Sequence, residues 1–301
     1  APRAPAGSAQ APAATAISKT SDGRGNNDQE AVMSVKTKKN GAVWTVIIDR
    51  PEARNAVNPE TAEALHHAFA DFEASPEAKV AVFTGSGGVF CAGGDLRYLS
   101  SLTEDNFHDR FIDGMAFPMG GAAPPPPIMG SSRMEFTKPV IGAIEGPAVA
   151  GGMELALTCD MRVMGESAYM GVYCRRWGVP LIDGGTIRLP RLVGQGKALD
   201  IVLTGRKVTA QECERIGLCE YIVPDGETRA KAEALAHEIT RFPWRTVLAD
   251  RRSVIEGRGL SVSDGLRLEW ANGLEAMRKD GVAGAARFRD GAGRHGDYQN
   301  I

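Results

Sequence analysis

The chain has 301 residues, of which 43% are hydrophobic and 24% charged, and this is the composition of an ordinary globular protein. Its formal net charge of -2 argues against a nucleic-acid surface or a membrane-binding face, and no apolar run approaches the ~20 residues that span a bilayer. The five cysteines have an odd count and no CxxC spacing, so we expect reduced thiols and no metal site.

Residues 1–30 differ from the rest of the chain. They are rich in Ala, Pro, Ser, Gly, Asn and Gln without any alternation, which predicts a disordered tail. The first 20 residues contain Arg3 and Lys19 but no acidic residue. They could be the remainder of an organelle transit peptide, and an expression or translation-start artefact is an equal alternative. The compartment, cytoplasm or mitochondrial matrix, stays open.

Apolar runs then alternate with helical patterns. A helix opens at Pro59 and carries Leu65, Phe69 and Phe72 on one stripe. Thr209 with Glu212 three residues later forms a capping box. The alternation predicts the α/β class, with a core over residues 31–226 and a helical C-terminal region over 227–301. The predicted strands span residues 43–49, 80–84, 139–144, 161–164 and 221–223, and further helices span residues 151–158 and 196–203.

The stretch between about Leu99 and Lys138 has the weakest pattern. It contains four prolines in succession, Pro124–Pro127, and the methionines Met115, Met119, Met129 and Met134. Long loops inside compact domains are usually either functional or disordered. Methionine and proline here could line an adaptable pocket, whereas a mobile surface loop is the preferred interpretation of the proline run itself.

Two glycine-rich segments carry the chemistry. In Phe90–Arg97, a glycine pair follows a buried strand, and glycine lets backbone amides approach a ligand closely. In the second segment, Gly151 and Gly152 open a helix with Glu154 in its first turn. Helix N-termini present free amides and positive dipole, which suits a developing anion. Taken alone, Glu154 would be read as a carboxylate that serves the helix dipole.

Together, the two segments closely resemble the crotonase superfamily, the enoyl-CoA hydratase/isomerase family. Arg50–Ala56 also resembles that family's Arg-Pro-x-x-x-Asn-Ala segment, whose backbone meets CoA. Downstream, Gly184–Thr186, Arg188–Arg191 and Ala198–Gly205 match the usual track. The resemblance extends from about Val35 to Gly291.

The resemblance implies a crotonase-like spiral of ββα turns over residues 31–226 and a trimerisation region over 227–301. It implies a homotrimer, or a dimer of trimers, that binds an acyl-CoA thioester and needs no cofactor beyond the CoA of its substrate. A trimer partner would bury part of an apolar set in the C-terminal region, namely Trp244, Leu248, Ile255, Leu260, Leu266, Leu268, Trp270 and Leu274.

The resemblance also implies site residues. The amides of Gly94 and Gly151 would form an oxyanion hole, and Glu154 would carry the proton transfer. The expected contacts to CoA are Ala53, Arg54, Ala56, Ala92, Gly94, Asp95, Leu96, Arg97 and Gly151.

The chain departs from the family at the second glutamate of the hydratases. Cys174 stands at that position, after Tyr173 in place of proline, and a thiol has a reference pKa of ~8.5 against ~4.3 for Glu. Asp183 is the nearest remaining acid, one residue later than the aspartate of some isomerase and dehalogenase relatives. For Asp183 we expect a helix N-cap before Gly184. Cys174 and Asp183 are therefore additional candidates for the site.

The expected activity is hydration of a 2-enoyl-CoA, a lyase reaction of fatty acid metabolism, because Glu154 is retained and this is the family's commonest activity. Isomerisation of 3-enoyl- to 2-enoyl-CoA is the first alternative, since one carboxylate can both remove and return a proton. A non-catalytic acyl-CoA-binding paralogue is the second, because the second glutamate is missing.

Overall fold

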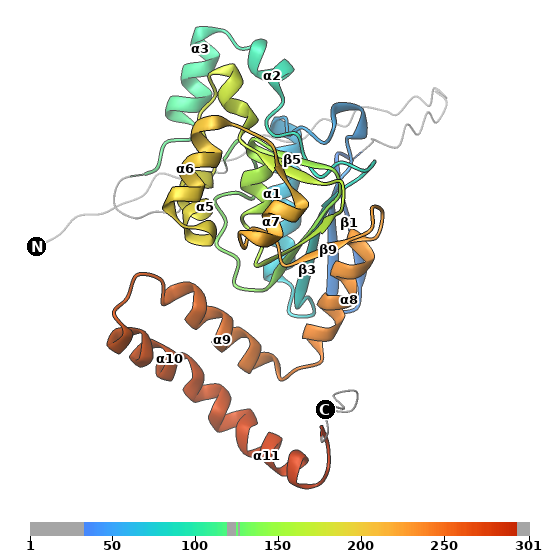
Figure 1. Cartoon of the computed structure of the whole chain (residues 1–301), viewed down its shortest axis with the longest axis vertical. Helices are drawn as coiled ribbons and strands as arrows, with labels where there is room; N and C mark the ends of the chain where they lie inside the picture. The colour runs from blue at the N-terminus through green and yellow to red at the C-terminus, as the bar shows by residue number, and fades with distance from the viewer. Residues whose placement is uncertain (1–32, 119–124, 126, 294–301) are drawn as a thin grey trace, which may run out of the picture. The chain divides into compact units, whose positions relative to one another are not determined.

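The computed structural model describes residues 33–118, 125 and 127–293, and the predicted tail over residues 1–30, Met119 and part of the proline run lie outside the described residues. The described chain contains a six-stranded and a three-stranded sheet with helices around them (Figure 1). The predicted α/β class is confirmed.

The large sheet has the strand order β1-β2-β3-β4-β6-β9. β1 is antiparallel to β2, and the other neighbours pair in parallel. Five of these strands coincide with the predicted apolar runs. The sequence did not predict β1, in which only Val35 is buried. The strands are β1 (Val35–Asn40), β2 (Val43–Ile48), β3 (Val80–Gly85), β4 (Val140–Ile144), β6 (Met161–Gly165) and β9 (Tyr221–Val223).

Both faces of the large sheet are covered, which explains why its inner strands are buried along their length rather than at alternate residues. Side chains that alternate along each strand face opposite cores. Trp44, Val46 and Phe83 pack with α1 (Pro59–Ala74), whose buried residues include the predicted stripe Leu65, Phe69 and Phe72. On the other face, Val43, Val82 and Ile141 pack with Ala232 and Ala236 of α8 (Thr228–Thr240).

The small sheet, β5-β7-β8, brings the two glycine-rich segments together. Its strands are β5 (Pro147–Val149), β7 (Tyr169–Gly171) and β8 (Val208–Thr209). Cys91 donates its amide to Pro147 O at 3.1 Å and accepts from Val149 N at 3.0 Å. The first segment therefore lies beside the strand that leads into α4 (Gly151–Ala156), the helix that carries Glu154.

Several short helices connect the strands of the two sheets. They are η1 (Pro51–Ala53), α2 (Leu96–Ser100), α3 (Glu104–Phe107), the π-helix η2 (His108–Asp113), the 3-10 helix η3 (Tyr173–Trp177), α5 (Gly185–Val193), α6 (Gln195–Thr204) and α7 (Ala210–Arg215). Half of the predicted capping box forms at the start of α7: the Thr209 side chain accepts from Glu212 N, whereas the Glu212 carboxylate binds Arg206.

The C-terminal region is helical, as predicted. Beyond α8 it consists of α9 (Trp244–Glu256), α10 (Val262–Ala276), the π-helix η4 (Met277–Gly281) and α11 (Val282–Arg289). α9 and α10 form an antiparallel pair, since Ser253 Oγ accepts from Asn272 Nδ2 at 3.1 Å and Arg245 pairs with Asp280 at 3.0 Å. Within the described residues, no helix is long and apolar enough to cross a bilayer.

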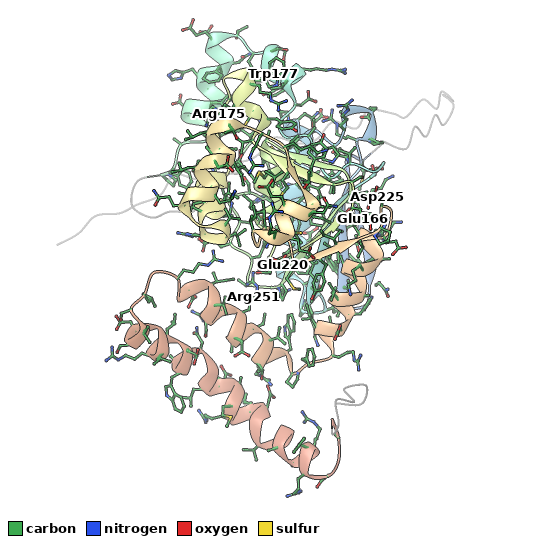
Figure 2. All side chains as sticks on the ribbon, viewed as in Figure 1. Glu166, Arg175, Trp177, Glu220, Asp225 and Arg251 are labelled. Atoms are coloured by element: carbon green, nitrogen blue, oxygen red, sulfur yellow. The ribbon has the colours of Figure 1, made fainter. Side chains whose placement is uncertain are left out.

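One arginine connects this helical pair to the sheet. Arg251 of α9, which is labelled in Figure 2, donates to both carboxylate oxygens of Asp160, at 3.1 and 3.0 Å, and to Phe136 O at 2.8 Å. Asp160 in turn accepts from Val140 N at the start of β4. Asp160, which follows Cys159, therefore has a structural role.

Candidate active site

A cavity of about 1050 Å³ lies at the ends of the two glycine-rich segments. Gly94, Gly151 and Glu154 line it, and so do Cys174 and Asp183. These residues come from four separate parts of the chain, and the structure brings them all to the same cavity.

The two glycine amides lie at the junction of β5 with the first segment. Val57 pairs with the first segment by donating to Gly93 O at 2.8 Å and accepting from Asp95 N at 2.9 Å, which leaves the Gly94 amide between them outside this pairing. Gly151 is the first residue of α4, so its amide has no acceptor within the helix. Gly93 has φ +97° and a Cβ there would lie 3.0 Å from Gly151 N, so only glycine allows this close approach.

Glu154 is buried, with 3% of its surface exposed. Its Oε1 atom accepts from the amides of Asp183 and Gly185, both at 2.9 Å. Burial, and next the negative charge of Asp183, raise the pKa of Glu154 to about 7, against the lowering effect of the two amides and Arg188. A carboxyl group with a pKa near neutrality can both accept and return a proton, so Glu154 is suited to acid–base chemistry.

The expectation that Asp183 caps a helix is wrong. The N-cap of α5 is Gly184, with φ +97° and no side-chain cap. The Asp183 carboxylate instead accepts at 2.5 Å from the Ser132 hydroxyl, and both side chains are buried. Burial raises the pKa of Asp183, although hydrogen bonds from Ser132 and the Met129 backbone oppose that effect. The left-handed Gly184 turn directs the aspartate inward, where it lines the cavity.

Cys174 also lines the cavity, within η3. Burial and the neighbouring Glu154 charge both raise the pKa of its thiol, so the neutral thiol is the stable form. A group of this kind is a poor base.

The expected CoA contacts divide into two groups. Ala92, Gly94, Asp95, Leu96 and Gly151 line the cavity. Ala53, Arg54, Ala56 and Arg97 are not among its lining residues within the described chain.

The Arg50–Ala56 segment, to which Ala53, Arg54 and Ala56 belong, nevertheless contacts the first glycine-rich segment. Arg54 O accepts from Ala92 N at 3.1 Å. Arg50 donates to Ala56 O at 2.5 Å and pairs with Asp95 at 3.2 Å. The Arg50–Ala56 segment therefore holds the first glycine-rich segment in place through its contacts with Ala92 and Asp95.

Sequence reasoning missed several residues around the site. Ser132 and Arg188 hold Asp183, and no motif that we interpreted marked them as site residues. The segment predicted as a loop contributes a mainly apolar wall, made by Leu99, Leu102, Phe107, Phe111, Met115 and Phe117. Met115 and Met129 do line the cavity. Trp177 lines it too and is largely exposed.

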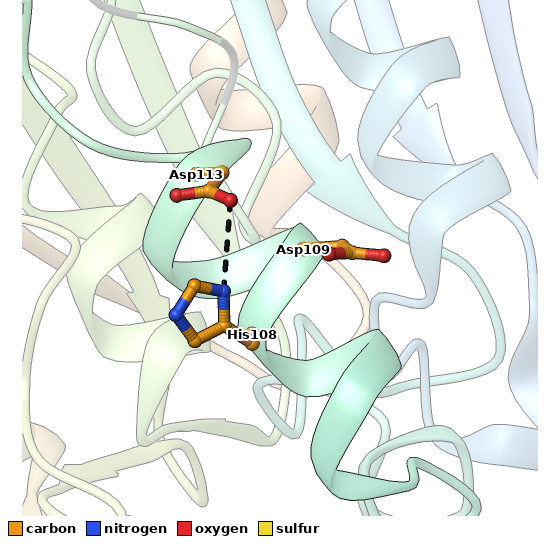
Figure 3. Close-up of side chains that lie close together, drawn as sticks. All are labelled: His108, Asp109 and Asp113. Carbon is orange, nitrogen blue, oxygen red and sulfur yellow. Dashed lines mark ion pairs between the residues drawn. The ribbon is translucent and has the colours of Figure 1, made fainter.

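A group of potential metal ligands lies on η2. His108, Asp109 and Asp113 each place one ligand atom within 4.8 Å of the others, and His108 pairs with Asp113 at 3.5 Å (Figure 3). All three are solvent-exposed, and none of them lines the cavity among the described residues. We therefore assign the trio no part in the site.

Comparison with known proteins identifies the family of the chain. The chain matches the enoyl-CoA hydratase/isomerase family over residues 38–114 and 131–252. It is 34% identical over 243 residues to the enoyl-CoA hydratase EchA19 of Mycobacterium tuberculosis, which covers 81% of this chain and 88% of that protein.

Solved structures extend the likeness to the fold. An enoyl-CoA hydratase from Bacillus anthracis superposes with a TM-score of 0.76 at 27% identity, over 85% of this chain and 96% of that one. An enoyl-CoA hydratase from M. tuberculosis H37Rv superposes with a TM-score of 0.75 at 28% identity, over 86% of this chain and 96% of that one. The predicted crotonase-like architecture is thereby confirmed.

Proposed function

The chain belongs to the enoyl-CoA hydratase/isomerase family, and from this membership we propose that it adds water to a 2-enoyl-CoA thioester to give a 3-hydroxyacyl-CoA. The observation that carries the proposal is the buried Glu154, held by two backbone amides in the cavity that Gly94 and Gly151 also line. Hydration needs a polarised carbonyl and a group that moves protons, and this cavity has candidates for both.

The carbonyl would be polarised by the Gly94 and Gly151 amides. As the water oxygen bonds to the β-carbon, the carbon–carbon π bond breaks and negative charge collects on the thioester oxygen. Preorganised amides stabilise that charge, and the loss of one such donor typically costs ~3–4 kcal/mol of barrier. The reaction is redox-neutral and its electrophile is already activated by the thioester, so we propose that it uses no cofactor beyond the CoA of the substrate.

Glu154 would carry the proton transfer. As a carboxylate it accepts a proton from the attacking water, and as a carboxylic acid it returns a proton to the α-carbon. The raised pKa of about 7 keeps both forms accessible near neutral pH, which is the condition for one group to act in both steps.

Asp183 is the better candidate than Cys174 for a second group. It presents a carboxyl to the same cavity, and its charge is sensed by Glu154. A neutral thiol cannot orient water by charge. We therefore assign Asp183 the orientation of the attacking water and Cys174 only the filling of the vacated glutamate position.

Isomerisation between 3-enoyl- and 2-enoyl-CoA is the second candidate. The thiol of Cys174 at the position of the second glutamate favours it, because isomerisation needs only one proton-transfer group. The buried carboxyl of Asp183 beside Glu154 favours hydration.

Product analysis separates these functions. The purified protein is incubated with short- and medium-chain 2-enoyl-CoA and 3-enoyl-CoA, and the products are resolved by chromatography and mass. Hydration predicts a product of 2-enoyl-CoA that is heavier by one water. An exclusive 3-enoyl to 2-enoyl conversion would establish the isomerase. Acyl-CoA binding without any turnover would favour the non-catalytic paralogue.

We also propose assembly into a homotrimer or a dimer of trimers. Several apolar residues of the C-terminal region remain exposed in the single chain, including Leu260, Leu266 and Trp270, and Trp270 has 70% of its surface exposed. An exposed apolar set of this size usually marks an interface.

For the compartment, all five cysteines are buried and free, which fits either the cytoplasm or the mitochondrial matrix. Cell fractionation distinguishes the two compartments.

A further inference from the structure

Arg188 lies behind the two carboxyls of the cavity. It comes from the first turn of α5, and its side chain runs back against the Gly184 turn, where a Cβ would lie 2.1 Å from Nη1. Arg188 is not among the residues that line the cavity. It can therefore act on the reaction only through other groups.

The guanidinium joins two separate segments. Its Nη1 donates to Asp183 O at 3.1 Å, and its Nη2 donates to Ser132 O at 2.8 Å. Ser132 also donates its hydroxyl to the Asp183 carboxylate at 2.5 Å. Arg188 thus holds the main chain of Asp183, and Ser132 holds its carboxylate.

The same turn holds Glu154. The amides of Asp183 and Gly185, on either side of Gly184, donate to Glu154 Oε1. Gly185 must approach closely, since a Cβ there would lie 3.0 Å from both Cγ and Oε1 of Glu154. Any movement of this turn therefore moves the hydrogen bonds that orient Glu154.

We propose that Arg188 is a positioning residue for both cavity carboxyls, acting on Asp183 through its main chain and through Ser132, and on Glu154 through the amides of the turn over residues 183–185. The planar fork of arginine suits this role, because it reaches two carbonyls in fixed directions and a lysine cannot do so. The proposal rests on the assignment of Glu154 to proton transfer in the proposed function.

Charge gives Arg188 a second effect in the same place. The groups that act on Glu154 electrostatically are Asp183 and Arg188, and those that act on Asp183 are Arg133 and Arg188. Cys174 faces Glu154, and Glu135 and Arg191 act on Arg188 itself. Arg188 lowers the pKa of Glu154 and of Asp183, so its removal raises both.

The test compares Arg188→Met, Arg188→Lys and Arg191→Met with the parent enzyme, by hydration kinetics on crotonyl-CoA over a range of pH. Arg191 lies on the same helix and is exposed, so Arg191→Met is the matched control. Arg188→Met should lower kcat about 10- to 100-fold, the loss typical of a misplaced catalytic group. KM and inhibition by butyryl-CoA should change less than about threefold.

The pH profile separates positioning from simple loss of structure. In Arg188→Met the acidic limb of kcat/KM should move to higher pH, because the carboxyls become harder to ionise. In Arg188→Lys the charge remains and the fork is lost, so kcat should fall while the limb stays near its parental pH. Thermal melts confirm that each variant is folded. If Arg188→Met does not fold, Arg188→Lys and Ser132→Ala provide the comparison, and Ser132→Ala should lower kcat without weakening butyryl-CoA inhibition.

Two outcomes would overturn the proposal. One is that a folded Arg188→Met matches Arg191→Met in kcat and in pH profile. If Arg188→Met does not fold, the same match by both Arg188→Lys and Ser132→Ala would overturn the proposal. The other is a variant whose loss lies entirely in KM and butyryl-CoA binding, which would make Arg188 a support of the binding cavity. A parent enzyme that hydrates no 2-enoyl-CoA would instead refute the proposed function.

Discussion

Replacement of Glu154 by glutamine should make the protein more stable at neutral and alkaline pH. Burial raises the pKa of this carboxyl from 4.5 to about 7 in the folded chain, so the folded state disfavours the charged form. A group with a raised folded pKa contributes stability below its unfolded pKa and loses it as pH rises through the folded value. The parent should therefore lose stability between about pH 4.5 and pH 7, and Glu154→Gln should not.

The magnitude follows from the shift. One pKa unit corresponds to about 1.4 kcal/mol, so a shift of this size corresponds to roughly 3 kcal/mol. Because Glu154 is almost fully buried, solvent screening reduces this little. The free energy of unfolding in urea, measured at one protein concentration from pH 5 to pH 8, should show the glutamine variant gaining roughly 2–3 kcal/mol on the parent across that range.

Glu269→Gln, at an exposed position on α10, is the matched control and should follow the parent at every pH. A difference between Glu154→Gln and the parent that does not vary with pH would refute the reasoning. Such a result would mean that Glu154 has the same proton affinity folded and unfolded. A stabilised variant with lost activity would show that the site retains a costly charge for function.

Three further predictions follow from the same geometry. Asp183→Asn removes the negative charge that raises the pKa of Glu154, so the acidic limb of kcat/KM should move to lower pH by up to about one unit, and an unchanged limb would contradict the coupling. Gly152→Ala should destabilise the fold by more than about 2 kcal/mol, because its Cβ would lie 2.1 Å from Cys91 O, and an unaltered melting temperature would contradict this packing. Light scattering should report a trimer or hexamer that Trp270→Asp weakens, and a parent that is monomeric across micromolar concentrations would count against assembly.

The hydrophobic pattern was sufficient to predict the inner strands of the large sheet. Val80–Phe83 and Val140–Ile144 are apolar throughout, because α1 and α8 cover both faces. β1 escaped prediction because it is an edge strand, and after Val35 its residues are exposed. The three strands of the small sheet are two or three residues long, and none of them coincides with a predicted apolar run.

The site was predictable only where glycine pairs follow buried strands. Gly94, Gly151 and Glu154 stand in such segments, and all three line one cavity. Ser132 and Arg188 lie 22 residues before and 34 residues after Glu154 in ordinary polar contexts, and only the tertiary fold brings them to Asp183. The inward direction of Asp183 depends on the left-handed backbone at Gly184, a conformation that a Leu-Ile-Asp-Gly-Gly sequence permits without requiring.

The most direct test of the proposed function is the hydration rate of a 2-enoyl-CoA by Glu154→Gln against the parent, with Cys174→Ala in parallel. Glutamine keeps the shape of Glu154 and cannot take a proton, so kcat should fall by ~10²–10⁴-fold with a much smaller change in KM. Cys174→Ala should retain most of the parental rate. A fully active Glu154→Gln beside an inactive Cys174→Ala would contradict the assignment of the proton transfer to Glu154.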